Sequence, residues 1–196
     1  MRVVVGLGNR GPEYEWTPHN MGFLAVDALA ERAKISVTRA EARSLVGRGR
    51  LAGQDIVLAK PQTMMNLSGL AVRMLIERYE SDPTETIVLI DEVDLPWGML
   101  RIRERGRNST HNGLKSVIAS LGTDEFIRVR MGVRPERIWG DRMDYVLCTM
   151  TADERRIAEE EAVEAAEAVE LILTEGVPKA MARFNHKASL QPGATE

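Results

Sequence analysis

The sequence predicts a single α/β domain built on a mixed β-sheet that is flanked by helices. Short apolar runs that are typical of strands alternate along the chain with longer segments of helical periodicity, and no linker separates them. Several strand-like segments alternate apolar and polar residues, whereas the strands of an all-parallel sheet tend to be apolar throughout, so antiparallel pairs are expected as well. The 196 residues fit one domain, expected at residues 1–186, with a loose tail at 187–196.

Six segments have the length and pattern of strands, and they lie at residues 2–6, 44–51, 55–60, 86–90, 99–103 and 127–133. The runs at 2–6 and 86–90 are apolar, which favours buried strands. The run at 127–133 alternates, so its apolar residues share one side while Arg128 and Arg130 take the other.

Four segments are expected to be helical, and they comprise one that begins near residue 20 and others at 66–79, 112–122 and 152–175. In the first, apolar residues recur at i, i+3, i+4 and i+7, which is typical of an amphipathic helix. Asn20 is predicted to cap it, and Asn112 is a candidate cap of the third helix, because an asparagine side chain can accept from the free N–H groups of a first turn.

Charge is distributed unevenly along the chain. The formal net charge is −3, yet residues 101–115 hold five basic residues against one acid, and residues 128–142 hold five arginines against two acids. Most of the opposing charge lies at 153–170. Because salt screens surface charges beyond about 10 Å, a basic face for nucleic acid can coexist with an acidic total. The alternative is a solvated surface with scattered arginines.

Three features bear on the compartment in which the protein works. No apolar run approaches the roughly 20 residues of a membrane span. The first residues, MRVVVGLG, pass from one arginine into a strand-like run without the longer apolar stretch and cleavage site of a secretory signal. The single cysteine, Cys148, excludes an intrachain disulfide framework and a cysteine-rich metal site. A cytoplasmic protein is therefore expected.

The stretch GLGNRG at residues 6–11 matches the G-x-G-x-x-G dinucleotide fingerprint and follows a strand. In that motif a helix begins within the glycines, so that its N-terminus meets the pyrophosphate. Here PEYEWTP follows, and Pro18 disfavours a helix at Thr17, which leaves room only for a turn. The glycines are expected to let the backbone turn. A nicotinamide-dependent oxidoreductase is accordingly the least favoured interpretation.

Short polar side chains follow the expected strands, which is where sites form in open α/β sheets. Two of the three histidines each precede an asparagine at an expected loop-to-helix junction. The polar residues placed in this way are Asn9, His19, Asn66, Asp91, His111 and Asn112. One carboxylate with amides and imidazoles does not match a usual metal-ligand set, so no metal site is expected.

These residue types suit hydrolysis. A histidine whose second nitrogen meets a carboxylate can take a proton near neutral pH, and asparagines can donate to a carbonyl oxygen as it gains charge. No serine or cysteine has the flanking pattern of an activated nucleophile, so direct attack by water on a carbonyl is favoured, with histidine as general base. Each residue also has a structural explanation by itself, such as a turn at Asn9 or a cap at Asn112, and His186 is expected at the surface.

Four sequence blocks follow one another between about residues 3 and 184: VVGLGNRGPEYEWTPHNMGFLAVDALA, KPQTMMNLSG, DEVDLPWGMLRIR, and HNGLKSV followed by LGTDEFIRVRMGV. Together they resemble bacterial peptidyl-tRNA hydrolase. The resemblance implies a monomeric single-domain α/β fold around a mixed, twisted sheet. It also implies hydrolysis of the ester that joins a peptide to tRNA. This reaction recycles tRNA from peptidyl-tRNA that is dropped during translation. It implies no cofactor, no membrane and no obligate protein partner.

The resemblance assigns roles to matching residues. His19 would activate water, Asp91 would hold His19 in its basic form, and Asn9 would separate N-blocked from free aminoacyl esters. The other matches would contact the substrate, and they are Tyr14, Met64, Asn66 and Asn112, with His111 on the same rim. Arg103 and Arg130 fall where the family grips tRNA phosphate, a contact that carries no base sequence.

Four features depart from the family pattern. Arg10 stands where proline is usual, Pro18 where arginine is usual, and Met64 where phenylalanine is common; RERGRNST at 103–110 replaces a glycine-rich loop. These changes concern substrate grip and loop motion more than the chemistry, because the proposed catalytic residues are intact. The altered loop also motivates a second interpretation, a non-catalytic scaffold of the same fold that binds RNA or a protein.

Overall fold

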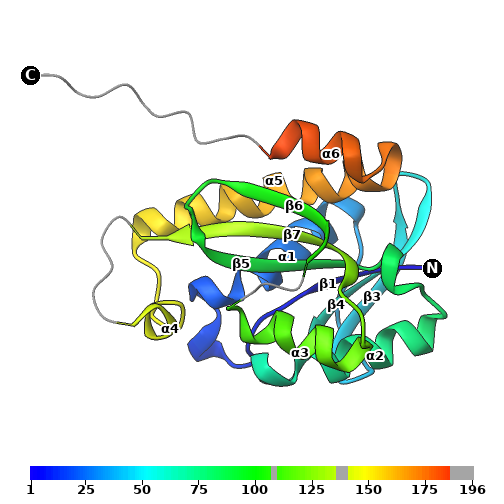
Figure 1. The fold of residues 1–196 in the computed structure, drawn as a ribbon, viewed down its shortest axis with the longest axis horizontal. Coiled ribbons are helices and arrows are strands. Elements are labelled where there is room, and N and C mark those ends of the chain that lie inside the picture. Colours follow the sequence, from blue (N-terminus) through cyan, green and yellow to red (C-terminus); the bar gives the residue numbers. More distant parts are fainter. Residues whose placement is uncertain (107–109, 136–140, 186–196) are drawn as a thin grey trace, which may run out of the picture.

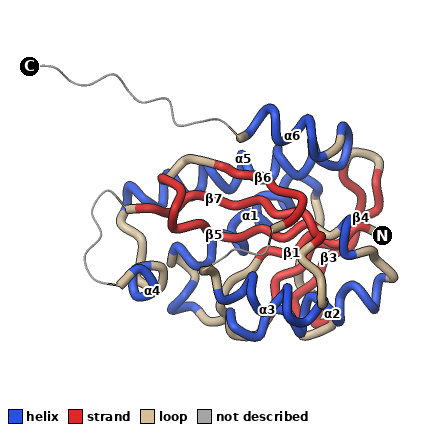
Figure 2. Tube along the Cα trace, viewed as in Figure 1, coloured by secondary structure: helices blue, strands red, loops and turns tan. Residues whose placement is uncertain are grey.

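The computed structural model describes residues 1–106, 110–135 and 141–185 of the chain. They form one α/β domain in which a seven-stranded sheet lies between two layers of helices (Figure 1). The strand order is β2-β3-β4-β1-β5-β7-β6, and Figure 2 shows the strands running through the middle of the molecule with helices on both sides. The tail predicted at 187–196 and His186 lie outside the described residues.

The strands are β1 Arg2–Gly6, β2 Arg39–Glu41, β3 Ser44–Leu51, β4 Gln54–Pro61, β5 Ile87–Pro96, β6 Leu100–Arg105 and β7 Glu125–Arg134. β4, β1, β5 and β7 run parallel, whereas β2, β3 and β6 are joined through antiparallel pairs. The predicted mixed sheet is thus confirmed, and each predicted strand is present. β2 was not predicted, because its three residues are too few and too exposed to show an apolar pattern.

The helices are α1 Met21–Ala33, α2 Ser68–Tyr79, α3 Asn112–Leu121, α4 Arg142–Tyr145, α5 Ala152–Glu175 and α6 Val177–Phe184. One apolar core joins α1, α5 and α6 to the first face of the sheet, and another joins α2 and α3 to the second. The four predicted helices are confirmed. α4 and α6 were not predicted, because each is too short for its apolar residues to establish a helical period.

Strand order and helix placement together create a crevice. α1 follows β1 on one face of the sheet, and α2 follows β4 on the opposite face, so the order reverses at β1. The carboxyl ends of β4, β1 and β5 meet there, which is where open α/β sheets form their sites.

The glycines of GLGNRG hold α1 close to the end of β1. A Cβ on Gly6 would lie 1.9 Å from the main-chain oxygen of Gly22, and one on Gly8 would lie 2.7 Å from the Phe23 ring. Among the three motif glycines only Gly11 has a positive φ, +117°, so the expectation that they serve a turn holds for Gly11 alone. A 3₁₀ turn, Pro12–Tyr14, follows the motif in place of the helix that a dinucleotide site requires.

Two details differ from the expected sheet. β5 continues past residue 90, so Asp91 is paired with Met131 inside the sheet instead of following the strand. The predicted alternation in β7 is confirmed, but its second side is covered as well. Arg128 is 0% exposed, and its guanidinium lies 4.3 Å from the centre of the Phe126 ring.

Candidate active site

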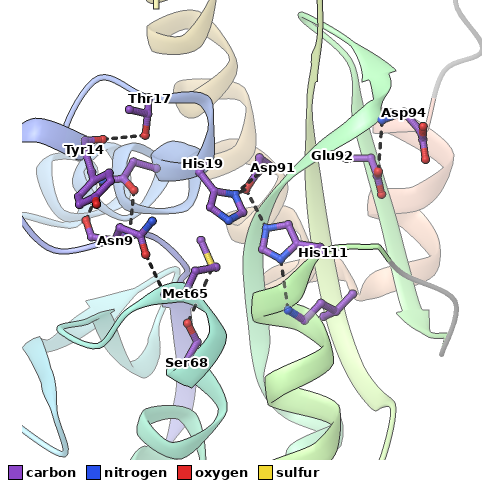
Figure 3. Close-up of polar contacts among 12 residues, drawn as sticks. Asn9, Tyr14, Thr17, His19, Met65, Ser68, Asp91, Glu92, Asp94 and His111 are labelled. Atoms are coloured by element: carbon purple, nitrogen blue, oxygen red, sulfur yellow. Dashed lines mark hydrogen bonds and ion pairs between the residues drawn. The ribbon is translucent and has the colours of Figure 1, made fainter. Parts of the chain in front are cut away.

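The predicted polar residues converge at the crevice from several elements. Asn9 lies just beyond β1, and Asp91 lies in the adjacent strand β5. His19 comes from the 3₁₀ turn Pro18–Asn20 that leads into α1, and His111 directly precedes α3. Figure 3 shows the two imidazoles beside the carboxylate of Asp91.

Asp91 lies between the two histidines. Both of its carboxylate oxygens are 3.1 Å from Nδ1 of His19, and Oδ1 is 2.8 Å from Nε2 of His111. Asp91 and His19 are buried, and the centroids of the two rings are 4.8 Å apart. One carboxylate therefore orients two imidazoles.

The hydrogen bonds determine which ring nitrogens carry protons. Nδ1 of His111 accepts from the main-chain N–H of Leu114 at 3.2 Å, so its Nε2 donates to Asp91. An ionised carboxylate only accepts, so Nδ1 of His19 donates to Asp91 as well. Nε2 of His19 is then the nitrogen left to accept a proton from a substrate or a water molecule.

The electrostatics suit a general base. Burial disfavours the charged form of His19, but the charge of Asp91 and the hydrogen bond to it prevail, so the pKa of His19 is raised above 6.5. Burial likewise favours the neutral form of Asp91, but His111 and His19 outweigh it and hold the pKa of Asp91 below its ordinary range. Asp91 thus stays ionised and stabilises a protonated His19.

Asn9 is held from two directions. Its Oδ1 accepts from the main-chain N–H of Met65 at 2.7 Å, and its main-chain N–H and C=O bond to the side chain of Asn20 at 2.8 and 3.0 Å. With Oδ1 in use, Asn9 has its amide nitrogen on the side that faces His19 (Figure 3). Asn20 is the N-cap residue of α1, as predicted, but its side chain makes no cap bond and instead joins the end of β1 to the start of α1.

The second cap prediction is corrected as well. The N-cap of α3 is His111, whose Nδ1 accepts from Leu114, and Asn112 is the first residue of the helix. A cap role for Asn112 is therefore excluded, and the residue contributes to the wall of the pocket beside His19. His111 combines two tasks, because it caps the helix and also binds Asp91.

A pocket of about 230 Å³ opens at the histidine pair. Its walls come from β5, from the start of α3 and from the segment around α4. The residues that line it are His19, Asp91, Glu92, Val93, Thr110, His111, Asn112, Asp141, Met143 and Val146. The structure thus brings four predicted site residues into one pocket.

The other predicted contact residues lie outside this pocket. Asn9 lines a separate hollow of about 290 Å³ together with Asn20. Met64 and Asn66 are exposed at the 3₁₀ turn that follows β4, and Tyr14 is half-buried in the turn after Asn9. Tyr14, Met64 and Asn66 line neither hollow.

The arginines of β6 and β7 lie beyond the pocket. Arg103 is exposed, and the strand register places it opposite Arg128. Arg130 is half-buried, and its Nη1 donates to Glu92 at 3.0 Å. A phosphate that bound Arg130 would therefore share its guanidinium group with Glu92. Residues 107–109 of the altered loop and 136–140 of the second basic segment lie outside the described residues.

His19, Asp91 and His111 also make a set that a metal ion can use, because one ligand atom from each lies within 4.8 Å of the others. The ring nitrogens that face Asp91, Nδ1 of His19 and Nε2 of His111, carry the protons that they donate to it. A metal ion bound through these two nitrogens would have to displace both protons. The geometry favours a hydrogen-bonded relay, and the absence of a metal site stays a prediction.

Sequence reasoning missed part of the pocket wall. Glu92, Val93 and Thr110 adjoin residues that were predicted, so their neighbours in the sequence were a sufficient signal. Asp141 lies near the end of the second basic segment, Met143 and Val146 follow it, and no motif marks these three residues. Their place in the site depends on how the chain returns from β7 to α5.

Known proteins resemble this chain along nearly its whole length. A family model described as peptidyl-tRNA hydrolase matches residues 3–192. The peptidyl-tRNA hydrolase of Koribacter versatilis is 47% identical over 188 residues, which cover 95% of this chain and 94% of the relative. That of Chloroflexus aurantiacus is 48% identical over 186 residues, 94% and 99% of the two chains. The crystal structure of peptidyl-tRNA hydrolase from Acinetobacter baumannii matches with a TM-score of 0.85 at 32% identity, covering 94% of each chain.

Proposed function

Because the chain belongs to the peptidyl-tRNA hydrolase family and hydrolyses peptidyl-tRNA, we propose that His19 is the general base that activates water for this reaction. The observation that carries the proposal is the buried pair of His19 and Asp91, 3.1 Å apart, at the pocket in the crevice. A base of this kind is more effective when a carboxylate fixes its tautomer and stabilises its protonated form.

The reaction needs no covalent intermediate on the enzyme. Nε2 of His19 takes a proton from water, whose oxygen attacks the ester carbonyl carbon. The tetrahedral intermediate collapses, the bond to the ribose oxygen breaks, and the proton on His19 passes to that oxygen. The products are a peptide with a free carboxyl group and tRNA with a free ribose hydroxyl, so atoms and charges balance without a cofactor.

Asn9 and Asn112 supply amide groups on two sides of His19. The rigid amide of Asn9 suits a contact that separates N-blocked from free aminoacyl esters, since a donor that cannot rotate rejects a poorly matched substrate. Asn112 lies in the pocket, where its amide can donate to the carbonyl oxygen as charge develops. The resemblance also assigns contacts with the substrate to Tyr14, Met64, Asn66 and His111, of which His111 lines the pocket.

Arg103 and Arg130 bind phosphates of the tRNA. Arg103 is exposed and can meet a phosphate directly, whereas Arg130 does so while it remains near Glu92. Contacts of this kind position the substrate over the pocket and are sensitive to salt.

The protein acts as a cytoplasmic monomer without an obligate protein partner. Across the described ranges, none of the helices has both the length and the apolar character that spanning a membrane requires. A substrate released during translation is itself cytoplasmic, which supports this placement.

The proposal is tested by the release of N-acetyl-amino acid from N-acetyl-aminoacyl-tRNA, with the unblocked aminoacyl-tRNA assayed in parallel. We expect rapid release from the blocked ester alone at catalytic amounts of enzyme. Asn9→Ala should then reduce the difference between the rates of release from the blocked and the unblocked ester. Release from neither ester, with tRNA still bound, would contradict hydrolysis and leave the non-catalytic scaffold.

A further inference from the structure

Two main-chain hydrogen bonds join the turn that carries His19 to the segment before α5. The main-chain N–H of His19 donates to the oxygen of Val146 at 2.9 Å, and that of Met150 donates to the oxygen of Trp16 at 2.8 Å. Val146 and Met150 are buried, so water cannot readily replace these bonds. The position of His19 therefore depends on where residues 146–150 lie.

The side chain of Tyr145 ties this segment to two other elements. Its hydroxyl accepts from Nε1 of Trp97 at 3.1 Å and donates to Oε1 of Glu154 at 2.8 Å. Trp97 lies directly after β5, the strand that carries Asp91, and Glu154 lies in the first turn of α5. The other oxygen of Glu154 accepts from the main chain and the hydroxyl of Thr151, at 2.8 and 2.9 Å.

The group between Trp97 and Glu154 must both accept and donate a hydrogen bond, and the hydroxyl of Tyr145 does both. An indole nitrogen only donates and a carboxylate only accepts, so the group between them must do both. Burial raises the pKa of Tyr145, and the bond to Glu154 raises it further, so the phenol keeps its proton. A phenylalanine ring would fill the same space and make neither bond.

We propose that Tyr145 is a positioning residue that fixes residues 145–150 between β5 and α5, and so holds His19 against Asp91. Tyr145 does not line the pocket, whereas its neighbour Val146 does, so it acts through the main chain of Val146. Small displacements of a reacting group have large effects on rate, so a hydroxyl outside the pocket can affect catalysis by fixing the position of His19. This inference rests on the proposed role of His19 as the base.

Tyr145→Phe tests the proposal. We expect kcat to fall about tenfold while KM changes less, because the base is displaced and the binding groups are kept. The acid limb of the kcat/KM profile should also move to lower pH. A weaker contact with Asp91 removes part of the effect that raises the pKa of His19.

Tyr79→Phe is the matched control. The hydroxyl of Tyr79 donates to the carboxylate of Glu41 at 2.6 Å, near the opposite edge of the sheet. Its loss should lower Tm without changing kcat or the pH profile. Glu154→Gln should act in the same direction as Tyr145→Phe but more weakly, because the one acceptor oxygen of glutamine preserves the capping box while its NH2 group cannot accept from Tyr145.

The inference would be overturned by a Tyr145→Phe enzyme whose kcat stays within about twofold of the wild-type value. It would also be overturned by a Tyr79→Phe enzyme whose kcat falls as far as that of Tyr145→Phe. His19→Ala, assayed in the same series, separates this failure from a failure of the proposed mechanism. A His19→Ala enzyme that remains active would show that His19 is not the base, and the proposed mechanism would fail. If His19→Ala is inactive and Tyr145→Phe is unimpaired, only the positioning role of Tyr145 is disproved.

Discussion

At His19 one carboxylate serves two imidazoles with different tasks. Asp91 accepts from Nδ1 of His19, which leaves Nε2 for water, and it accepts from Nε2 of His111, whose Nδ1 is occupied as a helix cap. Of the two, His19 alone retains an unprotonated nitrogen that is not already bonded to the main chain. The geometry therefore favours His19 over His111 as the proposed base, although both residues sit in a His-Asn pair.

Asp91→Asn should reduce kcat/KM by about two orders of magnitude or more, because an amide can no longer accept from both rings or stabilise an imidazolium. The pKa of His19 is raised by Asp91, and the base must be unprotonated, so kcat/KM rises with pH through that pKa. Without the carboxylate this limb should move to lower pH. A pH–rate profile checks both effects, and an unchanged limb would show that Asp91 does not act on the base.

Sequence alone predicted four of the residues that meet at this pocket but not how each side chain is used. His19, Asp91, His111 and Asn112 were placed at the crevice by their positions beside strands and helices. Asn20 has the predicted N-cap position without the cap bond, and His111 takes the cap predicted for Asn112, because a side chain before a helix can bond either to the first turn or across the crevice. At Asn20 the main chain of Asn9 lies within reach, and that contact takes precedence.

At the scale of elements, α5 is attached to the sheet through a buried carboxylate. Glu161 is 1% exposed; its Oε1 accepts from the main-chain N–H of Gly132 in β7 at 2.7 Å, and Oε2 accepts from Gly98 at 3.4 Å. Burial raises the pKa of Glu161 well above its ordinary value near 4.5, against the effect of these N–H groups. The helix that supports the segment behind His19 thus carries a group that ionises with difficulty.

This arrangement has a consequence for stability. A carboxyl group whose pKa is raised on folding holds its proton more strongly in the native state, so the free energy of unfolding falls as pH rises from about 4.5 through the raised pKa. Glu161→Gln should lose this dependence and gain stability on the order of 1 kcal/mol at pH 8, about 2–4 °C in Tm. Thermal melts between pH 5 and 9 measure it, with the exposed Glu160→Gln on the same helix as control. A variant that melts lower than wild type at every pH would contradict the account.

Periodicity was sufficient for the long elements and insufficient for the short ones. Residues 152–175 repeat an apolar stripe over many turns, and the predicted helix has those bounds. β2 has three residues and α6 has eight, so neither offers enough repeats. The extension of β5 through Asp91 depends on pairing with β7, which no local pattern reveals.

At the scale of the whole molecule, the arginines of β6 and the acidic residues of α5 lie on opposite faces of the sheet. Leu100 and Ile102 of β6 pack in the core beneath α5, so the arginines that alternate with them lie on the opposite face. The acidic residues of α5 accompany the first face (Figure 1). A net charge of −3 is therefore compatible with a basic surface, as the uneven charge along the sequence predicted.

Arg103→Ala should raise KM more than it changes kcat, because it removes a contact to the tRNA and leaves the chemistry intact. The slope of log KM against log salt should decrease by about one, the value for one phosphate contact. Arg50→Ala is the control, since Arg50 is exposed on β3, near the opposite edge of the sheet. An equal effect of both variants would place the tRNA on another surface.

If His19 is the general base, its removal should stop the chemistry and leave the binding surface for tRNA intact. The most direct measurement is single-turnover release of N-acetyl-amino acid from N-acetyl-aminoacyl-tRNA by His19→Ala, together with the Kd for tRNA. We expect a rate lowered by at least about a thousandfold with Kd unchanged, since only the proton acceptor is lost. Release at the wild-type rate, or loss of release explained entirely by lost binding, would contradict it.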